Sequence, residues 1–204
     1  MSLQPLLAEV DAAWFRDVDP RLLQKAKRSP LGQRLLSVWL MHDHAPRLFT
    51  PTPARNFGAI AGKWSRSRLA WLVRDLGILA YAPAVRGEVR RDPVRRLRNL
   101  LGNSYMLALD RSIWDGKVAP ALEQRLSSSL GVVVASTTNR DDDIWELLEL
   151  QGLQELRHWG ATQEPELAEW AKLMAPPLPD GVAHLPPEPV RMLHDHHLAR
   201  TMPN

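Results

Sequence analysis

The sequence predicts an all-α fold: a single irregular multi-helix domain with a proline-rich strap and a short C-terminal helix. Two observations lead to this expectation. Apolar residues recur at helical spacing in several segments, and residues typical of helix starts and ends flank those segments. The only β-branched run, at residues 131–134, is short and has no partner run, so we expect it to continue a helix.

An amphipathic helix is expected between residues 69 and 79, closed by Pro83. Its apolar residues fall at i, i+3, i+4, i+7 and i+10, which places them on one face. A second helix is expected to follow Asp92, an N-cap residue before Pro93, and to end at Gly102. The two inner stripes are Leu69, Leu72, Val73, Leu76 and Leu79, and then Val94, Leu97, Leu100 and Leu101.

Three more helices are expected before the strap. The first would be capped by Asn103 and would place Met106, Leu109 and Ile113 on one face. The second would open with three aspartates at residues 141–143, where the helix dipole favours carboxylates. Its buried side would be Ile144, Leu147, Leu148 and Leu156, flanked by Trp145 and Trp159, with Glu146, Glu149 and Glu155 mostly outside. The third, after Gly160 and with Pro165 in its first turn, would bury Leu167, Trp170, Ala171 and Met174.

The expected organisation is a helical domain over residues 1–175, a linker or strap over 176–189, and a helical tail over 190–204. Six prolines between residues 175 and 189 exclude a helix or a sheet interior there. The TPTPAR segment at residues 50–55 is expected to be a loop.

The composition excludes several kinds of site. The 204 residues include no cysteine, which rules out disulfides, thiolate zinc sites and a cysteine nucleophile. Residues 1–15 lack the basic start of a secretory signal, and no stretch approaches the ~18 apolar residues that span a bilayer. We therefore expect a cytoplasmic protein without a cofactor.

Charge is divided between two segments of the chain. Residues 21–98 hold seventeen Lys or Arg against four acidic residues, a local net charge of +13, whereas residues 141–170 hold nine Asp or Glu against one Arg, a net charge of −8. Such a division steers macromolecular partners, or the two segments face each other or water. The expected basic partner-binding face is Arg86, Arg90, Arg91, Arg95 and Arg96. The expected acidic face is Asp142, Asp143, Glu146 and Glu149, which would meet a second partner or the basic segment itself.

Nucleic acid is the alternative partner for the arginine-rich segment at residues 86–98. Arginines on a helix neutralise phosphates, with binding that weakens steeply as salt rises. No helix-turn-helix, RNA-recognition or zinc-finger signature accompanies this segment, and the acidic segment would repel a polyanion unless it faced away. A cationic surface for an acidic protein explains the arginines equally well.

Histidines cluster at residues 42–44 and at residues 194–197. His194 and His197, beside Asp195 and His196, could share a metal on one helix face, but no HExxH motif is present. We expect a surface helix with scattered histidines, and no metal. Nucleophile-elbow and phosphate-binding glycine motifs are also missing, so nothing in the sequence indicates an enzyme.

Two stretches of the chain carry a family resemblance. In the first, Leu76-Gly77-Ile78-Leu79 leads into Val85-Arg86 and then the stripe at residues 97–101. In the second, Leu150-Gln151-Gly152-Leu153 is followed by the Trp159 helix end, the Glu164-Pro165 break and the Trp170 helix, which ends at Ala175-Pro176-Pro177. Their order and spacing resemble the K component (SctK) of the type III secretion sorting platform over roughly residues 69–177. Residues 1–68 have no comparable match.

The resemblance implies an all-helical cytosolic adaptor without enzymatic activity. Such an adaptor would link the cytoplasmic domain of the inner-membrane ring protein SctD to the pod protein SctQ, and would lie peripheral to the inner membrane through the apparatus. The resemblance implies no catalytic residues. The binding faces expected above come from charge and not from the resemblance.

Overall fold

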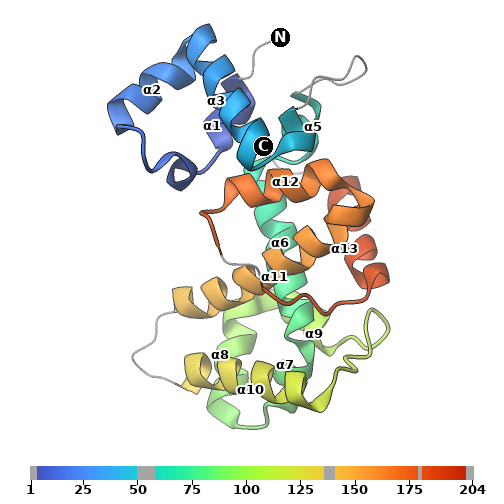
Figure 1. Cartoon of the computed structure of the whole chain (residues 1–204). Coiled ribbons are helices and arrows are strands. Elements are labelled where there is room, and N and C mark those ends of the chain that lie inside the picture. The colour runs from blue at the N-terminus through green and yellow to red at the C-terminus, as the bar shows by residue number, and fades with distance from the viewer. Residues whose placement is uncertain (1–3, 50–57, 136–140, 179–180, 201–204) are drawn as a thin grey trace. The chain divides into compact units, whose positions relative to one another are not determined.

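The computed structural model describes residues 4–49, 58–135, 141–178 and 181–200 (Figure 1). The predicted all-α class is confirmed, because the regular elements in these ranges are all helices. The loop expected at residues 50–55 lies outside them. In the ranges described, no helix combines the length and the apolar character needed to cross a membrane.

The contacts between residues divide the chain into two compact units. The first unit comprises residues 1–69 and 157–180, and the second comprises residues 70–156 and 181–204. The chain passes between the units within α6 (Arg66–Ala80), within α11 (Asp141–Gln163) and again between residues 180 and 181.

The first unit combines the N-terminal helices with a helix from late in the chain. Two of its helices begin at capped prolines: the Asp19 carboxylate accepts the N–H groups of Arg21 and Leu22 before α2, and the Ser29 hydroxyl accepts that of Gly32 before α3. Its elements are α1 (Gln4–Glu9), η1 (Ala12–Phe15), α2 (Pro20–Arg28), α3 (Pro30–Asp43), α4 (Pro46–Phe49), α5 (Gly58–Lys63) and α12 (Pro165–Met174).

Helix α12 joins these N-terminal elements through its buried face. The Trp170 indole N–H donates to the Trp64 carbonyl at 2.9 Å, and both rings are fully buried. The Glu169 carboxylate accepts the first N–H groups of α4, 2.7 Å from that of Leu48. The predicted burial of Leu167, Trp170, Ala171 and Met174 and the place of Pro165 are confirmed. The preceding helix does not end at Gly160 but runs to Gln163.

The second unit is built around the crossing of α6 and α11. An alanine Cβ at Gly77 would overlap the backbone carbonyl of Leu148, and one at Gly152 would overlap that of Val73. The two helices therefore approach each other more closely than any side chain allows. The predicted stripe from Leu69 to Leu79 is buried, as expected.

Five further elements complete the second unit: α7 (Ala82–Gly87), α8 (Arg91–Leu101), α9 (Tyr105–Leu109), α10 (Pro120–Ala135) and α13 (Pro187–Ala199), with a 3₁₀ turn, η2, at Gly102–Ser104. Pro83 lies in the first turn of α7, since α6 has already ended at Ala80. The prediction that residues 131–134 continue a helix is confirmed by α10. Gly102, at a φ of 54°, ends α8 as expected.

Three expected boundaries in the second unit are wrong. Helix α8 begins before Asp92, because Arg90 is extended and its carbonyl already accepts the N–H of Val94. Asn103 does not cap a helix, because it lies inside the 3₁₀ turn. The helix after the turn ends at Leu109, before Ile113, and Met106 is exposed. Helix α13 begins at Pro187 and not at Val190, because the first turn of a helix tolerates proline.

Candidate interaction surfaces

The expected acidic face lies along the first turns of α11. Asp142, Glu146 and Glu149 fall at i, i+4 and i+7 and share one side with Trp145. Asp143 is one residue out of this register and is half-buried. The structure therefore brings three of the four predicted acidic residues onto one helical face.

An arginine between two tryptophans borders this acidic face. Arg74 Nε donates to Glu149 Oε1 at 2.6 Å, and its guanidinium lies 4.9 Å from the Trp145 ring centroid and 5.7 Å from that of Trp71. The Trp71 side chain remains 46% exposed. Tryptophan and arginine are enriched where protein partners bind most strongly. From the sequence, Trp145 was expected only to flank the buried side of its helix, and Trp71 and Arg74 were not among the predicted binding residues, although their i, i+3 spacing was a readable signal.

The expected basic face is reduced by arginines that bind within the second unit. The Arg86 guanidinium donates to the carbonyls of Ala108 at 2.6 Å, Asp115 at 2.7 Å and Trp114 at 2.9 Å. Burial, with the nearby charge of Arg111, lowers the pKa of Arg86. Its bonds to carbonyls hold the segment after α9 against α7, which is a structural task.

Replacing Arg86 with alanine is expected to lower the free energy of unfolding by about 2–4 kcal/mol, because several carbonyls lose a charged donor. The measurement is denaturant unfolding followed by circular dichroism. As a control, the exposed Arg95→Ala should change stability by less than about 0.5 kcal/mol. Equal stability of both variants would contradict a structural role for Arg86.

Arg96 and Arg90 are also paired. Arg96 lies 3.0 Å from Asp141 and donates to the Val134 carbonyl at 3.2 Å, which joins α8 to the end of α10 and the start of α11. Arg90 binds Glu88 at 2.6 Å, and this hydrogen bond lowers the pKa of Glu88.

A stripe of arginines remains open on α8. Arg91, Arg95 and Arg98 fall at i, i+4 and i+7 and are exposed. The basic and acidic segments meet at the ion pairs Arg96–Asp141, Arg74–Glu149 and Lys63–Glu164, and each segment has other charged side chains that are exposed. The sequence left open whether the two charged segments face each other or face water. In the structure, some of their side chains pair with each other and others are exposed.

The expectation of surface histidines in the C-terminal helix is wrong for two of the three. His194 and His197 are buried, and only His196 is exposed. His197 Nε2 lies 2.9 Å from Asp75 Oδ2 of α6, and the Ser104 hydroxyl donates to Oδ1 at 3.0 Å. These contacts bind α13 to α6. The serine is bonded to the carboxylate and not to the imidazole, so the three groups lack the contact that activates a nucleophile.

Glu155 was expected outside and is instead 1% exposed. Its carboxylate accepts the backbone N–H groups of His184 and Leu185 at 3.0 Å and the side-chain amide of Gln151 at 2.7 Å. The His184 ring Nδ1 lies 3.2 Å away. The backbone donors of a proline-rich segment have few helical partners, so a buried carboxylate satisfies them. Glu155 thus binds the strap to α11, together with the Gln151 side chain, which also donates to the Val182 carbonyl at 3.0 Å.

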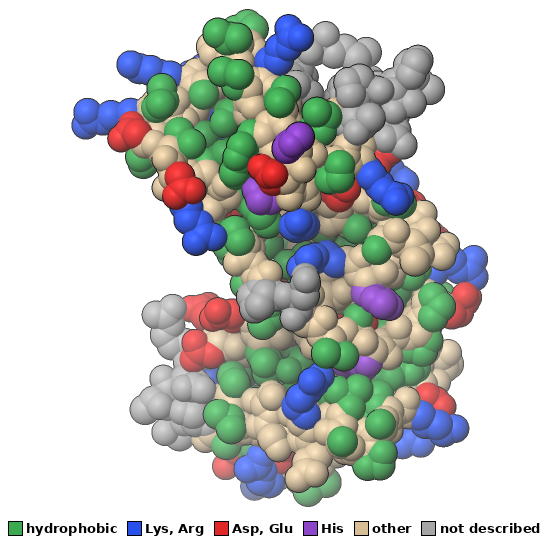
Figure 2. Space-filling view, in the orientation of Figure 1, with side chains coloured by type: hydrophobic (Ala, Val, Ile, Leu, Met, Phe, Trp, Pro, Cys, Tyr) green, Lys and Arg blue, Asp and Glu red, His purple; other side chains and the backbone are tan. Residues whose placement is uncertain are grey.

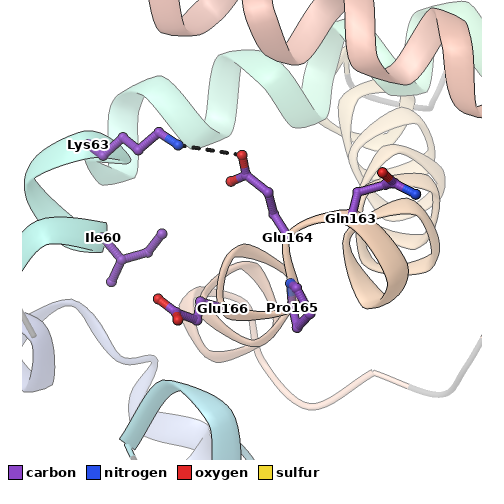
Figure 3. Close-up of a pocket in the computed structure, with 6 residues that line it drawn as sticks. All are labelled: Ile60, Lys63, Gln163, Glu164, Pro165 and Glu166. Carbon is purple, nitrogen blue, oxygen red and sulfur yellow. Dashed lines mark hydrogen bonds and ion pairs between the residues drawn. The ribbon is translucent and has the colours of Figure 1, made fainter. Parts of the chain in front are cut away.

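A surface pocket of about 350 Å³ lies in the first unit, between α5 and the turn that joins α11 to α12 (Figure 3). The side chains of Lys63 and Glu164 point toward each other across it, 3.4 Å apart, while Glu166 and Ile60 line another side. This lining supplies one amine and two carboxylates. Over the described part of the chain, no group of three or more His, Asp or Glu is arranged to hold a metal ion.

Comparison of the chain with protein-family models, with curated proteins and with solved structures finds no match.

Proposed function

We propose that this chain is a non-enzymatic adaptor of a bacterial type III secretion apparatus, linking the inner-membrane ring protein SctD to the pod protein SctQ at the cytoplasmic side of the inner membrane. The observation that carries the proposal is the crossing of α6 and α11. The two stretches behind the resemblance to SctK lie against each other there, through Gly77 and Gly152. The glycine of each stretch is thus needed for the same close contact between the two helices.

The surfaces of the second unit support a binding role. The acidic face of α11 and the arginine stripe of α8 each present exposed charge at helical spacing, and charge of this kind governs association rate and salt dependence. Trp71, Arg74 and Trp145 add an exposed aromatic and cationic cluster beside the acidic face.

The proposal is tested by measuring how tightly this chain binds purified SctD cytoplasmic domain and, separately, purified SctQ. The double variant Asp142→Lys/Glu146→Lys should weaken binding of one partner about tenfold and leave the other unchanged, and Arg91→Glu/Arg95→Glu should do the reverse. Exposed Glu123→Lys on α10 serves as the matched control. Failure of the unmodified chain to bind either protein would overturn the proposal.

The alternative function is nucleic-acid binding through the arginine stripe of α8. Arg91, Arg95 and Arg98 can contact phosphates, whereas Arg86 and Arg96 are engaged with protein groups. An electrophoretic mobility shift with a salt titration separates the two functions. The adaptor proposal predicts no tight binding of DNA or RNA. A nucleic-acid complex whose affinity falls steeply with salt, and which Arg91→Glu/Arg95→Glu abolishes, would favour the alternative.

A further inference from the structure

The hairpin of α2 and α3 in the first unit exposes an apolar ridge on its outer side. Leu31, Leu35 and Val38 fall at i, i+4 and i+7 on α3 and are 69%, 62% and 50% exposed. The opposite side of the same helix buries Leu36 and Leu40. Helix α3 is therefore apolar on two faces, and only one of them is covered in the first unit. Figure 2 shows hydrophobic side chains gathered on the surface over α2 and α3.

The ridge is not explained by packing within the hairpin. Trp39, at its margin, lies 5.4 Å from the Phe15 ring and 4.7 Å from the His44 ring, centroid to centroid. These ring contacts lie at the C-terminal end of α3, and none of the three ridge residues takes part in them. Contiguous exposed apolar residues at helical spacing are a common feature of protein interaction sites.

The hairpin that carries the ridge also carries exposed positive charge. The hairpin, residues 20–43, holds five Lys or Arg against one Asp. Lys27 is turned inward, where its ammonium lies 3.3 Å from the Val10 carbonyl and 5.4 Å from the Phe15 centroid. The other four form no ion pair with any described acidic residue and are exposed. They are Arg21, Lys25, Arg28 and Arg34.

We propose that the α2–α3 hairpin docks an amphipathic helix of a partner protein whose apolar stripe is flanked by Asp and Glu. The ridge from Leu31 to Val38 is about 10 Å long at 1.5 Å per residue, which matches two turns of a helix. Apolar contact between the stripes supplies affinity, and the four cations select an acidic partner and fix its direction. This inference stands apart from the second-unit surfaces of the proposed function.

The composition of the ridge favours a helix over a membrane. Arg34 lies beside the ridge on the exposed side of α3, three residues after Leu31 and four before Val38, so inserting the ridge into a bilayer would carry its guanidinium toward hydrocarbon. Against a partner helix, the same guanidinium meets a flanking carboxylate.

The test uses the full chain and a designed, dye-labelled helical peptide of about 18 residues, or five turns, with one leucine stripe flanked by glutamates. A matched peptide carries lysine in place of each glutamate. Fluorescence anisotropy is expected to show binding of the glutamate peptide, weakened by salt, and at least about tenfold weaker binding of the lysine peptide.

Two pairs of variants locate the site. Leu31→Ser/Leu35→Ser and Lys25→Glu/Arg28→Glu should each weaken binding of the glutamate peptide at least about tenfold. The matched controls Met106→Ser/Val132→Ser and Arg111→Glu/Arg125→Glu, all exposed in the second unit, should change it less than about twofold. Circular dichroism confirms that each variant is folded.

Four results would overturn the inference. These are no binding of the glutamate peptide, equal binding of both peptides, and binding that the hairpin variants do not weaken. The fourth is that anionic phosphatidylserine vesicles bind the chain more tightly than the glutamate peptide does, or that the chain self-associates, with either effect lost in the hairpin variants. Either result would identify a different occupant of the ridge.

Discussion

Replacing Gly77 with alanine is expected to lower the free energy of unfolding by about 3 kcal/mol or more. The added Cβ would overlap the Leu148 carbonyl, and the nearest atoms are backbone, which cannot rotate away as a side chain does. Relief therefore requires α6 and α11 to separate along the crossing, which exposes the buried stripe around Leu76. Denaturant unfolding measured by tryptophan fluorescence gives the change directly.

Gly87→Ala provides the matched control in the same unit. No atom lies within 4 Å of the Cβ that alanine would add at this position on α7, so its stability should stay within about 1 kcal/mol of the original, since alanine favours helix. Gly152→Ala should resemble Gly77→Ala. If Gly77→Ala unfolds at the same denaturant concentration as the unmodified chain, then α6 and α11 do not need the close backbone contact at Gly77.

Replacing Glu155 with alanine is expected to cost about 3–5 kcal/mol. The change leaves the backbone N–H groups of His184 and Leu185 without their acceptor in a buried place. The strap should then detach from α11 before the rest of the second unit unfolds, because the Gln151–Val182 and His184–Ala80 hydrogen bonds would have to hold it without the buried carboxylate. Limited proteolysis should cut residues 176–186 faster in this variant.

Two glutamine variants separate the role of Glu155 from that of charge alone. Glu155→Gln keeps one acceptor oxygen and should lose less stability than Glu155→Ala. Glu146→Gln, on the exposed face of the same helix, should be neutral within about 0.5 kcal/mol. Unchanged proteolysis of the strap in Glu155→Ala would contradict the account of how the strap is held.

Periodicity predicted the long elements well. The stripes of α6 and α12 and the aspartates that open α11 lie where 3.6-residue spacing and capping rules place them, since burial of one face dominates the stability of such helices. Short elements were predicted poorly. Helix α9 is five residues long and is held by tertiary contacts, such as burial of Ala108, which leave no periodic pattern.

Buried polar residues were the main failure of the sequence interpretation. Glu155, His194 and His197 were expected on the surface because charged and polar side chains usually lie there. Each is buried in the second unit, where Glu155 and His197 bind polar groups from residues distant in the chain. Only the fold brings those groups close, so sequence spacing alone contains no signal for them.

The same limit applied to the charged faces. The net charges of the two segments are correct properties of the sequence, but charge counting treats every arginine alike. Arg86 is engaged by backbone carbonyls, whereas Arg95, nine residues later, is exposed. The division of charge therefore overstated the basic area available to a partner, because Arg86 of α7 and Arg96 of α8 are both engaged within the second unit. The same count included the α2–α3 hairpin without predicting a surface there, although four of its cations are exposed and form no ion pair with a described acidic residue.

In the proposed function, this chain connects two proteins of a secretion apparatus through separate surfaces. Mass photometry of the chain mixed with SctD cytoplasmic domain and SctQ tests this connection. The proposal predicts a ternary complex whose mass contains all three proteins, and predicts that omitting this chain leaves the other two apart. Competition between SctD and SctQ for the chain, or no complex with either, would contradict it.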